Sequence, residues 1–478
     1  MNRRFLSTVA KTYRSIPQPS LIDLKRNGFP FMNYDTEIIP FLERSRLVYG
    51  DIYKFKAPLG PDVVVLFKPH HAEIAYRSAG KWPNRPGFHA IQQFRSQKEL
   101  YSNNSGLLSS QGQDWYDFRS KVQTALLRPR LIKAYHQRVN GVVEDFIKDI
   151  FENTLEDGKA SADLLEYLYQ WGLESTGVLA FDRRLGVLNP SLDSSSESQE
   201  IINLVQEIFS LSQYLERNMV WKYIGLLHGK YRQITKCLNR LEELTIKYVD
   251  EKIEMIERKG SCSDTSVIEN LYHAGCDKNV LCVLALDMLM AGVDTAANEI
   301  SFAFHYIAQN QKVQEKLFNE IRSLDIDDPN FVENAVYLRA TLKEVLRLKP
   351  TAYVNVRMCQ NSIELDDYLI QEGSMILFCH IVMCHDPRFV NDPLEFRPER
   401  YIKSHPHYER LQPFTSLPFG YGPRVCVGKR FANLEMGLLL ARIISKYKLE
   451  PTSEKLEIKV PLLLKPGGAI PVRFIKRL

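Results

Sequence analysis

Hydrophobic residues recur every three or four positions over much of the chain, which is the spacing of one helical face. This period predicts helices over 114–154, 162–182, 198–217, 229–258, 278–323 and 333–349. Alternating, β-branched sequence at 50–68 (GDIYKFKAPLGPDVVVLFK) predicts instead a hairpin with its turn at PLGPD. Strand-like sequence returns between 351 and 383, and a last helix is expected after Cys426, running to about Tyr447. The pattern therefore predicts a predominantly α-helical α+β protein whose small sheet joins distant segments.

The segment at 281–308, LCVLALDMLMAGVDTAANEISFAFHYIA, is apolar almost all round. Such a pattern is typical of a buried helix or of a membrane span. It contains Asp287, Asp294 and Glu299, and acidic side chains are costly in lipid. We therefore expect a helix that is buried in the protein.

A second apolar stretch, MVWKYIGLLHG at 219–229, lies between two predicted helices. An exposed cluster of this kind marks a membrane contact or a ligand entrance. A loop that folds back into the core would have the same composition, and the sequence leaves both interpretations open. The large apolar side chains of the stretch are Trp221, Tyr223, Ile224, Leu226 and Leu227.

The composition narrows the choice of partners and compartment. The length of 478 residues suits either two domains or one enzyme-sized unit. The formal net charge of +5 is small, and the basic residues form no stripe, so we expect no nucleic-acid partner. The eight cysteines include no CxxC pair, which argues for a reducing compartment without a zinc ribbon or a disulfide scaffold.

The start of the chain is basic and rich in hydroxyl side chains. It contains Arg3, Arg4, Lys11 and Arg14, and no acid precedes Asp23. This composition is typical of a mitochondrial transit peptide, which we predict at 1–25; a disordered basic tail is the alternative. Because no apolar run of about 20 residues lies here, an N-terminal membrane anchor is not expected.

A single cysteine, Cys426, lies in a loop rich in glycine, proline and arginine, PFGYGPRVCVGKR at 418–430. The loop contains a Gly-x-Gly, but Val425 replaces the third glycine of a dinucleotide fingerprint and no parallel-sheet unit precedes it. A Rossmann phosphate loop is therefore excluded. Backbone amides, Arg424 and a helix expected to begin at Val427 would instead stabilise a thiolate at Cys426.

A metal-bound thiolate is the chemistry that this loop favours. A cysteine without a second cysteine or histidine nearby suits haem iron better than structural zinc, which requires four protein ligands. The loop glycines Gly420, Gly422 and Gly428 would let the backbone approach a flat cofactor. A buried structural cysteine is the alternative for any isolated thiol.

The loop resembles the F-x-x-G-x-R-x-C-x-G haem loop of the cytochromes P450, and the resemblance extends over nearly the whole chain. The matching positions are Phe419, Gly422, Arg424, Cys426 and Gly428. The resemblance implies the cytochrome P450 fold with a small β-rich part, in one catalytic domain at 26–478. It also implies haem b with an axial thiolate from Cys426.

The same resemblance implies further contacts to the haem. WYDFR places Trp115 and Arg119 four residues apart on one helical face, as in the family's propionate-binding helix. Arg357 matches the strand arginine that contacts a propionate, Arg424 is expected to pair with a propionate, and Phe419 to pack against the porphyrin. Without the resemblance, these cations would be interpreted as ordinary surface or strand-edge residues.

Two motifs imply structural support for the loop. KEVLR contains Glu344 and Arg347, which can pair across one helical turn, and FRPERY contains Arg400. On their own these are ordinary candidates for surface ion pairs, which contribute little. The resemblance implies that the three form a buried network supporting the haem loop.

AGVDT at 291–295 is similar to the family's oxygen-activation motif. The resemblance implies that Gly292 makes room for dioxygen, that Thr295 hydrogen-bonds to bound oxygen or water, and that Asp294 relays protons from outside. The alternative for Thr295 is a hydrogen bond from its hydroxyl to the carbonyl four residues earlier.

No flavin or nicotinamide motif is visible, so the electrons must come from another protein. Arg339 and Lys343 lie one turn apart on the helix that carries Glu344, and Lys429 and Arg430 follow the cysteine. This arrangement resembles the mitochondrial branch of the family and implies docking of an acidic ferredoxin, which is reduced by an NADPH ferredoxin reductase. A solvated basic face is the alternative.

The function implied is a haem-thiolate monooxygenase on the matrix face of the mitochondrial inner membrane, in peripheral contact with it through 219–229. Segments such as LRLKPTAYVNVR and VCVGKRFANLEMGLLLA are most similar to those of arthropod ecdysteroid hydroxylases, which implies a lipophilic, sterol-like substrate such as ecdysone, hydroxylated with O₂ to 20-hydroxyecdysone. The alternatives are a xenobiotic-metabolising monooxygenase, a haem-thiolate isomerase or dehydratase, and a non-catalytic haem sensor or lipid carrier.

Overall fold

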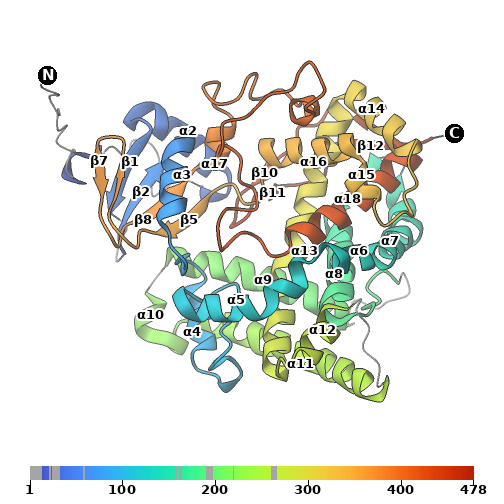
Figure 1. The fold of residues 1–478 in the computed structure, drawn as a ribbon, viewed down its shortest axis with the longest axis horizontal. Coiled ribbons are helices and arrows are strands. Elements are labelled where there is room, and N and C mark those ends of the chain that lie inside the picture. The colour runs from blue at the N-terminus through green and yellow to red at the C-terminus, as the bar shows by residue number, and fades with distance from the viewer. Residues whose placement is uncertain are drawn as a thin grey trace, which may run out of the picture. The chain divides into compact units, whose positions relative to one another are not determined.

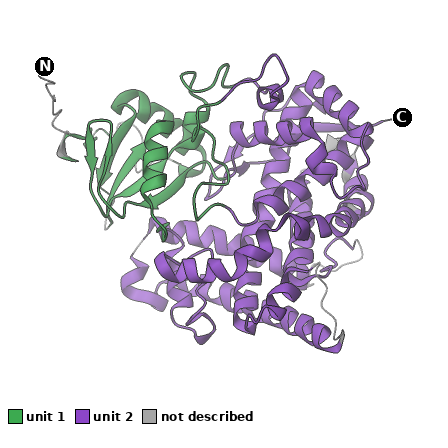
Figure 2. Cartoon of the chain, viewed as in Figure 1, with its two compact units in different colours: residues 1–86, 352–394, 411–425 green, residues 87–351, 395–410, 426–478 purple. Residues whose placement is uncertain are grey.

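The computed structural model describes residues 13–20, 23, 33–56, 60–156, 159–160, 164–189, 197–218, 220–259 and 266–477. The chain forms two compact units, each built from segments that are distant in the sequence (Figure 2). Unit 1 holds residues 1–86, 352–394 and 411–425, and unit 2 holds 87–351, 395–410 and 426–478. The predicted transit peptide lies mostly outside the described residues, which include only 13–20 and 23 of it.

Unit 1 contains the predicted sheet from distant segments (Figure 1). Strands β1 (Ile52–Lys56) and β2 (Asp62–Leu66) form the predicted antiparallel hairpin. β2 then pairs in parallel with β8 (Met375–Phe378), which pairs antiparallel with β5 (Asn355–Met358). The strands predicted on either side of the QEGS turn both exist, but they belong to different sheets, because β7 (Tyr368–Ile370) pairs with β6 (Ile363–Leu365).

Four helical segments with described bounds belong to unit 1. They are η1 (Tyr13–Ser15), α2 (Tyr34–Tyr49), α3 (Pro69–Ser78) and α17 (His380–Cys384). Tyr13 and Ile16 belong to the buried core, and the Tyr13 hydroxyl donates a hydrogen bond to Asp62 Oδ2 at 2.9 Å. Tyr13 and Ile16 are therefore part of the packed unit.

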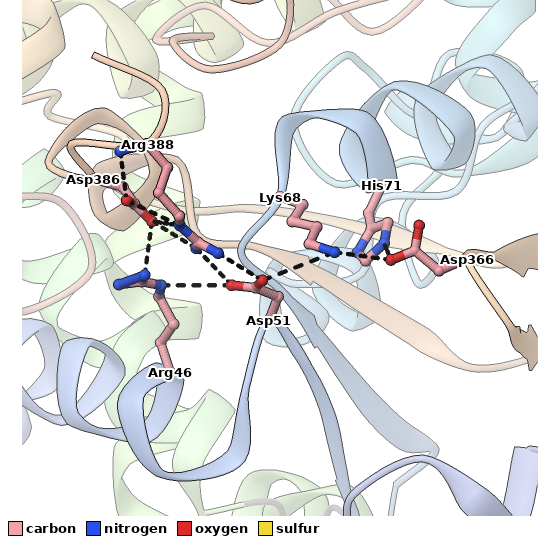
Figure 3. A network of polar contacts seen from close by, with 7 residues as sticks. All are labelled: Arg46, Asp51, Lys68, His71, Asp366, Asp386 and Arg388. Atoms are coloured by element: carbon pink, nitrogen blue, oxygen red, sulfur yellow. Dashed lines mark hydrogen bonds and ion pairs between the residues drawn. The ribbon is translucent and has the colours of Figure 1, made fainter. Parts of the chain in front are cut away.

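Ion pairs connect the ends of several elements of unit 1 (Figure 3). Arg388, after α17, binds both carboxylate oxygens of Asp51 at 2.8 and 2.7 Å and also binds Asp386 at 2.7 Å. Lys68, before α3, lies 2.9 Å from Asp366 at the β6–β7 turn. Arg388 and Asp51 thus form a two-point pair, and such pairs fix geometry as well as charge. The network is completed by Arg46 and His71.

Unit 2 is mainly helical. Its helices are α4 (His89–Arg95), α5 (Gly112–Leu127), α6 (Pro129–Ala134), α7 (His136–Asp145), α8 (Leu164–Phe181), α9 (Glu197–Arg217), α10 (Trp221–Ile224), α11 (Gly229–Lys259), α12 (Val267–His273), α13 (Lys278–Gln309), α14 (Gln311–Arg322), α15 (Phe331–Asn334), α16 (Val336–Leu348) and α18 (Lys429–Lys446). Its shorter turns are η2 (Glu99–Tyr101), the π-helix η3 (Phe146–Phe151), η4 (Glu152–Thr154), η5 (Gly225–Leu227) and η6 (Pro398–Tyr401). Its strands are β3 (Leu155–Glu156), β4 (Lys159–Ala160), β9 (Tyr447–Pro451), β10 (Ile458–Lys459), β11 (Lys465–Pro466) and β12 (Val472–Lys476).

The predicted helices exist, but three of them are divided. The helix predicted at 333–349 is interrupted at Ala335, which separates α15 from α16. The helix predicted at 114–154 breaks before Pro129, which lacks a backbone N–H and disfavours helical geometry at Arg128. The helix predicted at 278–323 breaks at Asn310, whose φ of −125° and ψ of 74° are not helical. Asn310 thus ends α13 and precedes α14.

The long apolar helix α13 is the core of unit 2. It is the one described helix long and apolar enough to cross a membrane, yet 78% of its most apolar window is buried inside the protein. Helix α8 crosses it without room for side chains at two positions. A Cβ at Gly172 would lie 2.8 Å from the Val293 carbonyl oxygen, and a Cβ at Gly292 would lie 2.5 Å from Thr176 Oγ1. The prediction of a buried core helix is therefore confirmed.

Candidate functional site

The loop at 418–430 has the backbone that its glycines permit. Gly420 and Gly422 have φ values of +73° and +76°, which residues with a side chain rarely adopt. The Val425 N–H then donates to the Gly422 carbonyl at 3.0 Å. Helix α18 begins at Lys429, not at the predicted Val427, because Gly428 is the residue whose carbonyl accepts the first helical hydrogen bond.

Cys426 differs from the other described cysteines in its exposure. Cys282, Cys359, Cys379 and Cys384 are buried, whereas Cys426 is exposed. Burial raises the pKa of Cys282 to about 12 and that of Cys359 to about 11, so these thiols stay protonated. Cys426 is exposed just before the N-terminus of α18, where no side chain caps the helix. That position favours an anion.

Helix α5 carries Trp115 and Arg119, the pair that the sequence predicted to contact a propionate. Trp115 and Arg119 are both buried, as their spacing of four residues on one face allows. Arg119 Nε donates to Gln123 Oε1 at 3.3 Å, and no carboxylate among the described residues pairs with its guanidinium. Burial lowers the Arg119 pKa, and the nearby Cys426 opposes that effect. The structure thus brings Arg119 close to the Cys426 thiol within unit 2.

Arg357 is a second buried guanidinium, in strand β5 of unit 1. It donates to the Val356 carbonyl at 2.8 Å and lies over the Tyr76 ring, 5.4 Å from its centroid. Its pKa is lowered by burial, and no acidic side chain among the described residues faces it. A Cβ at Gly420 would lie 3.9 Å from its Nη2 atom. Of the other loop residues in unit 1, Arg424 is buried and Phe419 is partly buried.

Asp294 and Thr295 lie near the middle of α13. The Thr295 hydroxyl donates to the Ala291 carbonyl at 2.9 Å, which is the hydrogen bond of the alternative interpretation. Its oxygen keeps lone pairs that can accept another hydrogen bond. Burial raises the Asp294 pKa to about 6, while Lys465 lowers it and Glu166 raises it further. The Oδ1 atom of Asp294 makes no hydrogen bond to any described residue.

Gly292 has a packing role on α13 that the sequence did not suggest. Its bare Cα faces Thr176 of α8. The close helix crossing gives this glycine a packing role, and its role in making room for dioxygen stays a prediction.

The three network residues form a buried cluster in unit 2. Arg347 donates to both carboxylate oxygens of Glu344 at 2.8 Å, and Arg400 Nε donates to Glu344 Oε1 at 2.9 Å. The Arg397 N–H also donates to Glu344 Oε1, at 3.0 Å, and Arg400 pairs with Glu409. The side chains of Glu344, Arg347 and Arg400 are fully buried. Two carboxylates thus balance two guanidinium groups in this cluster.

The four cations predicted to dock a ferredoxin are exposed. They are Arg339, Lys343, Lys429 and Arg430. Lys343 on α16 has a pKa lowered first by partial burial and then by two neighbouring cations, Arg339 and Lys429. The structure therefore gathers these three charges in one place, which we call the basic cluster. Arg430 is also exposed, at the start of α18.

The apolar stretch at 219–229 is partly buried and partly exposed. Trp221 is buried, stacks on Tyr231 at 4.8 Å and donates to the Leu215 carbonyl at 2.9 Å. Four other side chains of the stretch are exposed, and Leu227 is the most exposed at 84%. The structure therefore combines the two interpretations, because Trp221 packs inward while these four side chains face solvent. The exposed four are Tyr223, Ile224, Leu226 and Leu227.

Sequence reasoning missed one buried acid next to the proton-relay motif. Glu299, one turn after Thr295 on α13, accepts hydrogen bonds from the Thr351 hydroxyl at 2.9 Å and from the Thr351 N–H at 3.3 Å. Burial raises its pKa to about 8. A charged residue inside an otherwise apolar run was the available signal, but it was used only to argue against a membrane span.

Comparison with known proteins agrees with this arrangement. The cytochrome P450 family matches residues 29–471. The chain is 30% identical to "Probable cytochrome P450 12a5, mitochondrial" of Drosophila melanogaster, over 97% of this chain and 91% of that protein. It is 32% identical to "Cytochrome P450 CYP12A2" of Musca domestica (92% and 86% covered) and 30% identical to "Probable cytochrome P450 49a1" of Drosophila melanogaster (95% and 81%).

The chain belongs to the cytochrome P450 family. It is therefore a haem-thiolate monooxygenase whose cofactor is haem b, held by a cysteine thiolate. The described residues suit that cofactor, which carries two carboxylates. Arg119 and Arg357 are buried guanidinium groups that no described carboxylate neutralises, and buried charges of this kind require a counter-charge.

Proposed function

We propose that the chain hydroxylates a lipophilic, sterol-like molecule, with Cys426 as the iron ligand. The observation that carries this proposal is the exposed Cys426 before the uncapped start of α18, with the buried Arg119 beside it. The bound haem supplies the oxygen chemistry. One molecule of O₂, two electrons and two protons convert a C–H bond to C–OH and release one water. Arg119, Arg357 and Arg424 neutralise the propionates, and Trp115 and Phe419 pack against the cofactor.

We propose an ecdysteroid, such as ecdysone, as the substrate. The support is the sequence similarity of the helix that follows Cys426 and of the segment around Arg357 to ecdysteroid hydroxylases. A xenobiotic substrate is the competing choice. Turnover of ecdysone against a panel of xenobiotics, with ferredoxin, its reductase and NADPH present, separates the two. Product formed without ferredoxin and NADPH would contradict a monooxygenase reaction.

We propose the mitochondrion as the compartment and a ferredoxin as the electron donor. Relatives of this chain are named mitochondrial. The predicted transit peptide at 1–25 agrees with that location. Tyr13 and Ile16 pack in the core of unit 1, so cleavage before Tyr13 preserves contacts that cleavage at 25 removes. The exposed tip of 219–229 is proposed to contact the matrix face of the inner membrane.

The basic cluster is the proposed docking site for the ferredoxin. Changing Arg339 and Lys343 together to Glu reverses two exposed charges that attract an acidic partner. We expect the ferredoxin concentration for half-maximal turnover to rise about tenfold or more, and to depend less on salt. Peroxide-driven turnover, which needs no donor protein, should stay near the wild-type rate. An equal loss in both assays would indicate misfolding and contradict a docking role.

Asp294 and Thr295 are proposed to deliver the protons. With a pKa of about 6, the Asp294 carboxyl is protonated below that pH and ionised above it, so it exchanges protons readily near neutrality. We expect Asp294→Asn to lower kcat by about tenfold to a hundredfold and to remove the change in rate near pH 6. Thr295→Ala should keep NADPH consumption but release hydrogen peroxide in place of product.

The ratio of product formed to NADPH consumed, measured across pH, checks both variants. Thr176→Ser, a change at the α8 crossing that keeps the hydroxyl, is the matched control. Unchanged coupling in Thr295→Ala would remove that residue from the relay.

A further inference from the structure

A cleft of about 440 Å³ lies beside the exposed apolar tip of unit 2. One wall is α4 and the residues after it, and the other is α10 and the start of α11. The α4 wall presents amide and hydroxyl side chains, among them Gln92, Gln93 and Ser96. The opposite wall presents Lys222, whose neighbours in the chain are buried Trp221 and exposed Tyr223.

The walls of the cleft are fixed in place. Trp221 stacks on Tyr231 from α11. His89 on α4 donates its backbone N–H to Glu216 Oε1 at 2.6 Å, and its ring Nδ1 lies 2.7 Å from Glu216 Oε2. The Glu216 carboxylate is thus held by His89 and lies close enough to Lys222 to oppose the lowering of the Lys222 pKa by burial.

The segment 217–236, which includes one wall of the cleft, carries only basic charges. From 217 to 236 the sequence contains five basic residues and no Asp or Glu. All five are exposed. Arg217 and Lys222 precede the exposed apolar side chains at 223–227, and the other three follow them on α11, so cations flank the apolar tip on both sides in the sequence. These residues are Arg217, Lys222, Lys230, Arg232 and Lys236.

We infer that the cleft binds the headgroup of an anionic phospholipid while the apolar tip enters the bilayer. Apolar side chains favour the acyl region, and each cation near an anionic surface adds attraction. The cleft adds what a diffuse charge cannot, because the ammonium group of Lys222 and the side-chain amides of Gln92 and Gln93 line one cleft and can donate to one phosphate. This inference rests on the proposed membrane contact and specifies its lipid.

Vesicle binding by the full-length holoenzyme tests the inference. Binding is measured on vesicles of phosphatidylcholine alone and of phosphatidylcholine mixed with phosphatidylglycerol. We expect the wild type to bind the anionic vesicles at least tenfold more tightly. Lys222→Gln should lower binding to anionic vesicles about tenfold and leave binding to neutral vesicles unchanged. Gln93→Leu, which changes no charge, should reduce the anionic preference several-fold.

Two controls separate the cleft from its surroundings. Lys236→Gln removes one exposed cation of the same segment that does not line the cleft, and should cost about fivefold at most. Leu226→Ser combined with Leu227→Ser should weaken binding to both kinds of vesicle, because it removes the inserted apolar side chains. Equal effects of Lys222→Gln and Lys236→Gln would overturn the cleft as a headgroup site and leave diffuse attraction.

The source of the phosphate and the proposed activity are tested separately. Inorganic phosphate, compared with chloride at equal ionic strength, should not displace the protein from anionic vesicles; full displacement would assign the cleft to a soluble phosphate and overturn the inference. Equal wild-type binding to both vesicles, or none to either, would also overturn it. Turnover in detergent solution should be the same for wild type and Lys222→Gln, and its absence in the wild type would contradict the proposed activity without bearing on lipid.

Discussion

Replacing Cys426 with serine is expected to abolish turnover and to remove the far-shifted Soret band of the reduced, carbon monoxide-bound protein. That band reports a thiolate ligand, and a neutral hydroxyl donates far less electron density to iron. Burial raises the pKa of Cys282, Cys359 and Cys379, so these thiols stay protonated and are poor substitutes. Partial burial also raises the pKa of Cys237 and Cys276, which opposes thiolate formation there.

The matched control is Cys237→Ser, which removes a half-buried thiol of α11 far along the chain from the loop. Its spectrum and turnover should equal those of the wild type. Persistence of the thiolate band in Cys426→Ser would overturn the assignment of the ligand. Loss of the band in both variants would point to a general sensitivity to cysteine replacement.

Replacing Glu344 with glutamine is expected to destabilise the protein by about 3–5 kcal/mol, because it leaves two fully buried guanidinium groups with one carboxylate. The new amide also turns an NH₂ group toward Arg347 and Arg400, which are themselves donors. Chemical unfolding followed by fluorescence measures the loss, and the haem content of the purified protein reports whether the network supports the loop.

Glu409→Gln is the control for this variant. Glu409 pairs with Arg400, and its side chain is 13% exposed, so water can compensate part of the lost charge. We expect a loss of about 1–2 kcal/mol. A loss below about 1 kcal/mol for Glu344→Gln would mean that the cluster does not need charge balance.

The sequence predicted the main chemistry because its signals are local. The spacing of Phe419, Gly422, Arg424, Cys426 and Gly428 within one loop pointed to the family, and the family match confirms it. The helices were predicted because their apolar faces repeat over many turns. Trp115 with Arg119, four residues apart, is likewise a local pattern, and the structure buries both side chains.

The features that the sequence did not predict depended on contacts between distant segments or on single backbone positions. Gly292 faces Thr176, more than a hundred positions earlier, and no local pattern reveals that neighbour. The break at Asn310 and the start of α18 at Lys429 are decided by single backbone hydrogen bonds. Whether Trp221 points inward was undecided, because its partner Tyr231 lies on the next helix.

The crossing of α8 and α13 limits how this enzyme can evolve. A methyl group at Gly172 would meet the Val293 backbone below normal contact distance, and one at Gly292 would meet the Thr176 hydroxyl, so a side chain at either position forces a shift at the crossing. Asp294 and Thr295 directly follow Val293 on α13, so the crossing also fixes their position relative to α8. Substitutions that change the range of substrates are therefore expected away from this crossing, at positions where the new side chain meets solvent.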